Sequence, residues 1–148
     1  MTRSFQALAG FILIATVMLP CAARADEQDT IDYRKHIMKT MGEQAAAITE
    51  ILQQKAPAEN FAVHAQILAV TAATAKKAFE PKVLGGEAKP DVWTHWADFA
   101  KGLDDLTAAT ADLAKTAKGG GVVTAAPKVE AALACKNCHD TYCAEKKK

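Results

Sequence analysis

The sequence has few of the residues that build β-sheets or a large aromatic core. Aromatic residues make up 6% of its 148 residues, and it contains 8 glycines and 5 prolines. A sustained alternation of apolar and polar residues, the pattern of a half-buried strand, is missing. Gly and Pro cluster at only three places, which leaves long helical stretches between them. We therefore expect one small all-α domain, whose Ala-rich chain offers a limited core of its own.

The sequence lacks the motifs of several functional classes. It has no Ser/His/Asp grouping, no Gly-rich phosphate loop and no site of paired carboxylates. The 18 basic and 17 acidic side chains nearly balance, so a nucleic-acid partner is not indicated. Beyond the N-terminus, no segment is long and apolar enough to cross a membrane.

The first 25 residues have the pattern of a cleaved signal peptide. Arg3 provides the positive start, residues 11–19 form a short apolar stretch, and Ala-Arg-Ala at 23–25 is a suitable cleavage site. We expect a mature chain that begins at Asp26, forms one domain over residues 26–148 and is exported to the periplasm, with no membrane attachment. A lipoprotein anchored at Cys21 and a retained N-terminal anchor are the alternatives.

The clearest chemical signal is Cys135-Lys-Asn-Cys138-His139, near the C-terminus. C-x-x-C-H is the attachment pattern of c-type haem. On a helix these three side chains share one face, so both thiols can form thioether bonds to one haem while the imidazole binds its iron as proximal ligand. The alternatives are a disulfide, a thioredoxin-like redox pair and half of a zinc site. The last two lack a βαβ context and a second ligand pair, respectively. The motif predicts one covalent haem c, held through two thioether bonds.

Four helices are expected, and each carries one apolar stripe at helical spacing. Their short connections predict an antiparallel up-down-up-down four-helix bundle. Asp29 or Thr30 is the expected N-cap of the first helix and Asp91 that of the third, while glycines 119–121 should form a flexible turn. The helices are expected over residues 30–54, 58–79, 91–117 and 124–145.

The same stripes predict the core. The expected core residues are Ile37, Met38, Met41, Ala45, Ile48, Ile51 and Leu52 in the first helix, with Tyr33 at the start of its stripe, Phe61, Ile67, Leu68 and Val70 in the second, and Trp93, Trp96, Phe99, Leu103, Leu106 and Leu113 in the third.

This topology also predicts what faces the haem motif. The first and last helices run antiparallel, so the motif lies level with the first turns of the first helix, which carry His36, Met38 and Met41. His36 is on the opposite side of the helical wheel from the apolar stripe and should face solvent. Met38 and Met41 are on the stripe. Each is either a plain core residue or a thioether for the second side of the iron.

Taken together, these features resemble the class II c-type cytochromes, the cytochrome c prime family, over nearly all of the mature chain. The similarity rests on residues 135–142, on Asp32-Tyr33-Arg34, and on the connection from Phe79 to Trp93. Low-spin members place a Met in the region five residues after this Tyr. The resemblance therefore implies that Met38 is the sixth iron ligand, with Met41 in reserve, and that Arg34 contacts a haem propionate.

One position departs from the family. High-spin members usually carry Arg four residues after the proximal His, where this chain has Cys143. The change weakens the interpretation as a gas sensor and leaves a thiol that is either buried, free or bridged to a second subunit.

The leading hypothesis is a periplasmic carrier of single electrons, and not an enzyme. It would use His/Met ligation and transient redox protein partners. The resemblance also suggests a homodimer through the first two helices. The alternative is a high-spin haem protein that binds NO or CO. A small peroxidase ranks last, because the first helix offers no evident distal acid/base pair.

Overall fold

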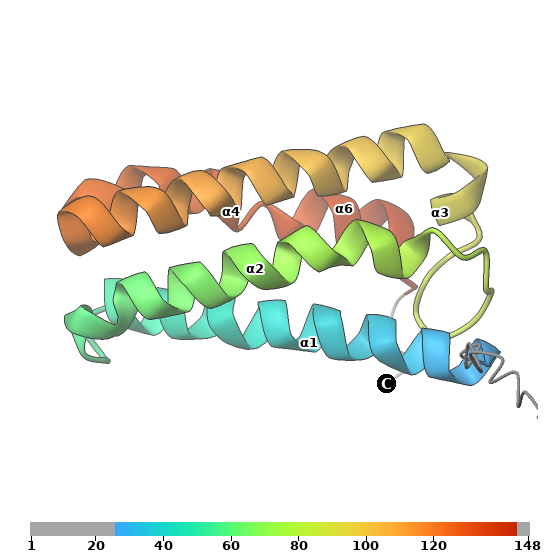
Figure 1. Cartoon of the computed structure of the whole chain (residues 1–148), viewed down its shortest axis with the longest axis horizontal. Helices are drawn as coiled ribbons and strands as arrows, with labels where there is room; N and C mark the ends of the chain where they lie inside the picture. The colour runs from blue at the N-terminus through green and yellow to red at the C-terminus, as the bar shows by residue number, and fades with distance from the viewer. Residues whose placement is uncertain (1–25, 145–148) are drawn as a thin grey trace, which may run out of the picture.

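The computed structural model describes residues 26–144, which fold as a four-helix bundle with its helices aligned along one long axis (Figure 1). Within these residues there is no strand, only isolated bridges that pair Gly85 with Ala88 and Ala88 with Cys143. The all-α class and the four-helix bundle are therefore confirmed. The elements are α1 (Glu27–Leu52), η1 (Ala58–Asn60), α2 (Phe61–Phe79), α3 (Asp91–Thr94), α4 (Trp96–Ala125), η2 (Ala126–Lys128), α5 (Val129–Ala132) and α6 (Cys135–Tyr142).

Helix α1 begins earlier than the sequence pattern indicated. Asp26 is its N-cap, and its carboxylate accepts a hydrogen bond of 2.7 Å from the Asp29 backbone N–H. The Asp29 carboxylate accepts in return from the Asp26 N–H at 3.3 Å, which completes a capping box. The prediction of Asp29 or Thr30 as N-cap is therefore wrong, because Asp29 occupies the third position of the first turn. The expected signal peptide, residues 1–25, lies outside the described residues, so its cleavage stays a prediction.

The third expected helix is divided near its start and runs longer than predicted. His95, at φ −115° and ψ 44°, separates α3 from α4. No side chain caps α3, so the expected Asp91 cap is wrong; the Asp91 carboxylate lies 3.8 Å from the His95 imidazole instead. Among residues 119–121, only Gly121 leaves the helical conformation, at φ 67° and ψ −163°. The turn at this end of the bundle is therefore a single-residue kink rather than a flexible three-glycine loop.

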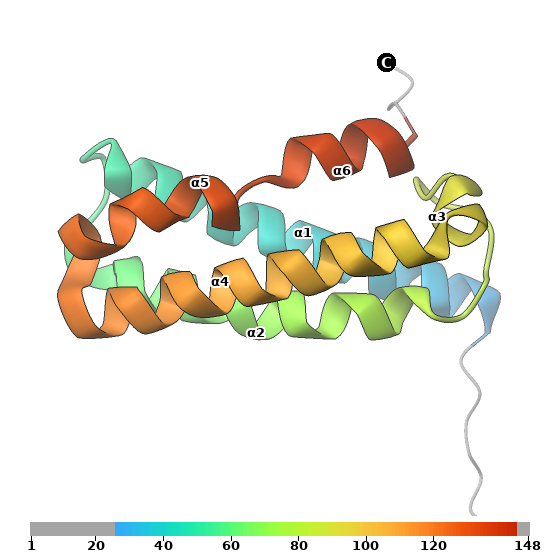
Figure 2. The same cartoon turned by 90° about the horizontal axis from the view of Figure 1, so that it is seen from above.

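The fourth expected helix is not continuous. It divides into η2, α5 and α6, with a break at Leu133 and Ala134. A short turn makes this break, since the Cys135 N–H donates to the Leu133 carbonyl at 2.7 Å. Figure 2 shows α5 and α6 following one another along the bundle with a bend between them. The break allows the haem motif to occupy a helix of its own.

The core follows the predicted stripes, with three exceptions. Tyr33 is 53% exposed, Leu52 is 36% exposed and Val70 is 54% exposed, so their assignment to the apolar stripes is wrong. His36 faces solvent, as expected. The buried residues include Ile48, Phe61, Leu68, Phe99, Leu103 and Leu113.

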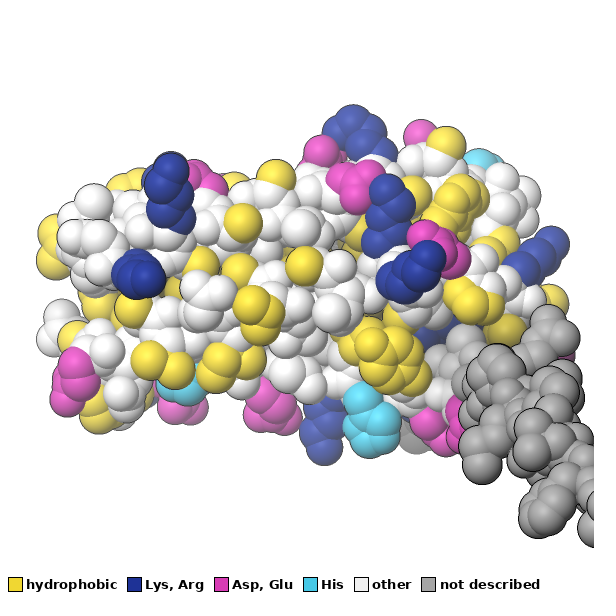
Figure 3. All heavy atoms as spheres, in the orientation of Figure 1, with side chains coloured by type: hydrophobic (Ala, Val, Ile, Leu, Met, Phe, Trp, Pro, Cys, Tyr) yellow, Lys and Arg dark blue, Asp and Glu magenta, His cyan; other side chains and the backbone are white. Residues whose placement is uncertain are grey.

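The outer surface carries both signs of charge. On the face seen in Figure 3, basic and acidic side chains are interspersed among apolar ones, without a one-signed patch. Among residues 26–144, no helix combines the length and apolar character needed to cross a membrane.

A candidate haem site

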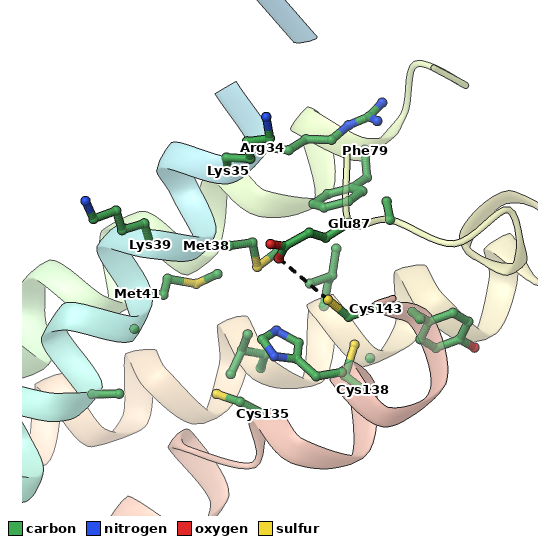
Figure 4. Close-up of a pocket in the computed structure, with 18 of the residues that line it drawn as sticks. Arg34, Lys35, Met38, Lys39, Met41, Phe79, Glu87, Cys135, Cys138 and Cys143 are labelled. Atoms are coloured by element: carbon green, nitrogen blue, oxygen red, sulfur yellow. Dashed lines mark hydrogen bonds between the residues drawn. The ribbon is translucent and has the colours of Figure 1, made fainter. Parts of the chain in front are cut away.

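A large cavity lies between α1 and α6, next to the side chains of α4 (Figure 4). Its volume is about 1150 Å³. Phe99, Leu103 and Leu106 of α4 form part of an apolar wall, and Leu68 of α2 adds to it. An Ala-rich, aromatic-poor chain thus leaves a space inside its bundle that suits a large, flat, mostly apolar group.

The haem motif lines this cavity. Cys135, Cys138 and His139 all border it from α6, and both thiols are half-buried. The two cysteines are not bonded to each other. In the described part of the chain, no three His, Cys, Asp or Glu side chains come together as a ready metal site. The donor set fits a porphyrin that brings its own iron better than it fits a zinc ion, because a protein zinc site needs at least three such side chains together.

Burial affects the acidity of both thiols. It raises the pKa of Cys135 above the usual value for a thiol. It likewise raises the pKa of Cys138, with a smaller effect from the neighbouring Cys135 and Cys143. Both side chains therefore stay protonated at neutral pH, which disfavours the thiolate chemistry of a redox pair.

The two methionines of α1 border the cavity on the side opposite α6. Figure 4 shows the Met38 and Met41 side chains extending from α1 toward the space above Cys135 and Cys138. Met38 is half-buried, and Met41 is 7% exposed. The structure thus brings together the haem motif and both candidate thioethers, and it leaves His36 outside.

Arg34 occupies an unexpected environment. It is 4% exposed and is therefore not a solvated surface arginine. Its Nε donates to the Ala78 carbonyl at 3.0 Å, Nη1 to Val83 at 2.7 Å and Nη2 to Pro81 at 2.6 Å. The guanidinium also lies 5.1 Å from the Phe79 ring centroid and 4.9 Å from that of Trp93.

Burial lowers the pKa of the Arg34 guanidinium, but an arginine in a protein keeps its charge. Each of its three nitrogens donates one hydrogen bond to a different carbonyl. A guanidinium has five N–H donors, so two remain. A contact with a haem propionate therefore stays a prediction, and only the remaining donors could serve it.

Sequence analysis missed the contribution of the α2–α3 connection. Gly85, Gly86, Glu87 and Ala88 border the cavity, and the Cys143 thiol lies 3.9 Å from a Glu87 carboxylate oxygen (Figure 4). The Gly85-Gly86 pair was the sequence signal for a turn in this connection. In the structure both glycines have positive φ, at 125° and 65°. The pair marked a turn but not what the turn packs against.

A helical bundle with a C-x-x-C-H motif beside an internal cavity defines a class of haem c protein. Comparison with known families agrees, because the family model described as Cytochrome C' matches residues 29–143. The chain belongs to the cytochrome c' family, and it is a haem c protein with one covalently bound haem.

Two relatives and two solved structures illustrate the similarity. Cytochrome c' of Alcaligenes xylosoxydans xylosoxydans is 28% identical over 125 residues, which cover 80% of this chain and 95% of that protein. Cytochrome c' of Rubrivivax gelatinosus is 32% identical over 121 residues, with coverages of 77% and 93%.

Both structures are variants of cytochrome c prime from Alcaligenes xylosoxidans, and each is 25% identical to this chain. One is a nitric oxide complex with a TM-score of 0.75 that covers 82% of this chain and 99% of its own. The other has carbon monoxide bound, a TM-score of 0.74, and coverages of 82% and 98%. The similarity thus favours the NO- or CO-binding alternative over the electron carrier.

Proposed function

We propose that Cys135 and Cys138 hold the haem through thioether bonds and that His139 is its proximal ligand. The support is that all three side chains border one cavity from a single short helix. Haem iron supplies reversible binding of diatomic gases and one-electron redox chemistry when it is present. The residues of α6 fix the group at its proximal side, and α1 provides the opposite wall.

On the face turned toward α1, we propose that the protein binds NO or CO. The observation that carries this proposal is the mostly apolar cavity between α1 and α6. Its α1 wall includes Met38, Met41 and Ala45, with the charged residues Lys35, Lys39 and Glu43 also on its border. A neutral diatomic molecule is tolerated in apolar surroundings, where a charged or strongly polar ligand is disfavoured. The relatives that have NO or CO bound support the same conclusion.

One-electron transfer is the second candidate function. The observation that favours it is the position of Met38, which borders the cavity on the side opposite α6. A permanent Met38–iron bond with His139 opposite would close the gas site and suit a redox carrier. A peroxidase is not supported, because His36 faces solvent and supplies no acid/base group to the cavity.

Optical spectra of the purified protein separate the two functions. For a gas-binding protein, the dithionite-reduced form should take up CO with a shift of its Soret band, and NO should do the same. For a carrier, the ferric spectrum should show the weak near-red thioether-to-iron band, and the reduced protein should not respond to CO. A reduced protein that is inert to both gases contradicts the proposed function.

The location and assembly of the protein are further parts of the proposal. We propose export to the periplasm, which the N-terminal pattern supports, and a homodimer through α1 and α2. The face of α2 exposes Val63 at 57% and Val70 at 54%, one heptad apart. A Val70→Glu variant should sediment as a monomer, whereas Val123→Glu, at a valine of α4 that is 89% exposed, should not. An unchanged sedimentation coefficient for Val70→Glu would reject this dimer.

A further inference from the structure

The α2–α3 connection, residues 80–90, forms a strap along one edge of the cavity. Its residues from Gly85 to Ala88 border the space that the haem would occupy. It contacts α1 at one end and the end of α6 at the other. We infer that Arg34 is a positioning residue, which locks this strap against α1 and thereby fixes Met38 on the distal side of the haem.

The first anchor is Arg34 itself. Its three hydrogen bonds go to Ala78 in the last turn of α2 and to Pro81 and Val83 in the strap. These acceptors are 44 to 49 residues away in sequence, so the side chain joins α1 to the end of α2 and to the strap by long-range hydrogen bonds. Phe79 and Trp93 both lie against the guanidinium, and the Trp93 indole N–H donates to the Phe79 carbonyl at 2.9 Å. A planar fork held this way cannot be replaced by a lysine without losing bonds.

A second anchor lies one turn before Arg34 in α1. The strap passes over Ile31 so closely that a Cβ on Gly85 or on Gly86 would lie 2.9 Å from the Ile31 side chain. Both glycines also have positive φ, which an L side chain rarely adopts. The strap therefore follows the surface of α1 closely over this turn.

The third anchor ties the strap to the haem helix. The Ala144 N–H donates to the Glu87 carbonyl at 2.7 Å, and the Lys89 N–H donates to the Tyr142 carbonyl at 2.9 Å. The Lys89 ammonium reaches the carbonyls of Asp140 and Thr141, both at 3.2 Å. These bonds hold the last turn of α6, which also carries His139, against the strap.

The three anchors connect the distal wall to the proximal wall. Met38 follows Arg34 by four residues and lies on the same face of α1, one turn further on. Fixing Arg34 to the strap and the strap to α6 therefore sets the separation of Met38 and His139 across the cavity. Loosening the Arg34 anchor should let this part of α1 move, and with it the side chain that limits access to the iron.

The test compares Arg34→Gln and Arg34→Lys with the wild-type holoprotein. Lys101→Gln is the matched control, because Lys101 is an exposed cation on α4 whose partner is Asp105. Amide hydrogen exchange is measured for residues 27–40 and 80–90. CO association with the reduced protein and the ferric spin state are measured at a temperature well below unfolding.

If Arg34 positions Met38, Arg34→Gln should raise exchange in both segments and change the CO association rate by about tenfold. Arg34→Lys should show nearly the same changes as Arg34→Gln. Lys101→Gln should have the exchange rates and CO association rate of the wild type. Faster exchange with a CO rate and spin state equal to wild type would overturn the inference and leave Arg34 a purely structural residue.

A second variant keeps the test decisive if Arg34→Gln does not fold. Gly86→Ala perturbs the Ile31 anchor without changing any charge near the haem, and the same shifts in exchange and CO rate are expected. The CO association rate is informative only if the proposed function is correct. The ferric spin state and the amide hydrogen exchange do not depend on that function. A wild-type protein that fails to bind CO rejects the proposed function only, whereas unchanged exchange and spin state in both variants reject the role of Arg34.

Discussion

At the scale of single residues, Met38 and Met41 should have different tasks although both border the cavity. Met38 is half-buried on the wall that faces the haem, whereas Met41 is 7% exposed and packs into the core. If the haem occupies this cavity as proposed, Met38 would control the distal side of the iron, and Met41 would stabilise α1 against its neighbours.

Truncating these two side chains should separate the tasks. Met38→Ala should speed CO association by about tenfold or more, because it opens the distal side. Met41→Ala should instead lower the free energy of unfolding by about 2–5 kcal/mol, as large-to-small core changes do, with a smaller effect on CO. Stopped-flow mixing with CO and denaturant titration measure the two quantities. If Met41→Ala had the larger effect on CO, Met41 would be the distal residue.

Single residues also show which features of the site the sequence could predict and which it could not. The haem motif and the inward position of Met38 follow from spacing on a helix, so both could be predicted. The contacts of Arg34 could not, because its acceptors lie 44 to 49 residues along the chain. Leu52 and Val70 were misplaced because a helical stripe gives a direction but not how far neighbouring helices cover it.

At the scale of elements, the kink at Gly121 interrupts the long helix α4 four residues before its end. Its φ of 67° and ψ of −163° lie where almost only glycine is found. Nothing lies within 4 Å of a Cβ built there, so the cost of a side chain is conformational rather than steric.

Replacing Gly121 should therefore destabilise the bundle. Gly121→Ala should cost about 1–3 kcal/mol from backbone strain. Gly119→Ala is the control: it also has no atom within 4 Å of its Cβ, but it is helical, and the change should stabilise by up to about 1 kcal/mol. Thermal unfolding of both variants measures the difference. Equal melting temperatures would show that the kink is not needed.

Helix α6 should depend on the haem for its position. It has only 8 residues, none of them buried, and it faces α1 across the cavity. A helix this short is not stable by itself. In the haem-free chain, amides of residues 135–142 should exchange faster than in the holoprotein, while α2 and α4 stay protected. Equal protection of α6 in both forms would show that the strap alone holds it.

The break before α6 explains why the fourth helix was predicted as one piece. Residues 129–138 contain neither Gly nor Pro, so no local signal marks the turn at Leu133 and Ala134. By contrast, the bundle topology followed from apolar stripes and short connections. Tertiary packing around the cavity, which the sequence pattern does not contain, favours the break.

At the scale of the whole molecule, the low content of aromatic residues goes together with the large cavity. With 6% aromatic residues, the chain leaves about 1150 Å³ between α1 and α6, and a haem would complete that core. The distal wall then comes from α1, the proximal wall from α6, and the strap joins them. The proposed gas binding depends on this arrangement, and the arrangement depends on haem attachment at residues 135–139.

Mass spectrometry of the protein expressed with a haem-attachment system tests that attachment directly. The intact mass should equal the chain from Asp26 to Lys148 plus one haem, and the haem should remain on the peptide that contains Cys135 and Cys138 after denaturation. A Cys135→Ser, Cys138→Ser variant should lack it. A denatured wild-type chain with no added haem would contradict the account.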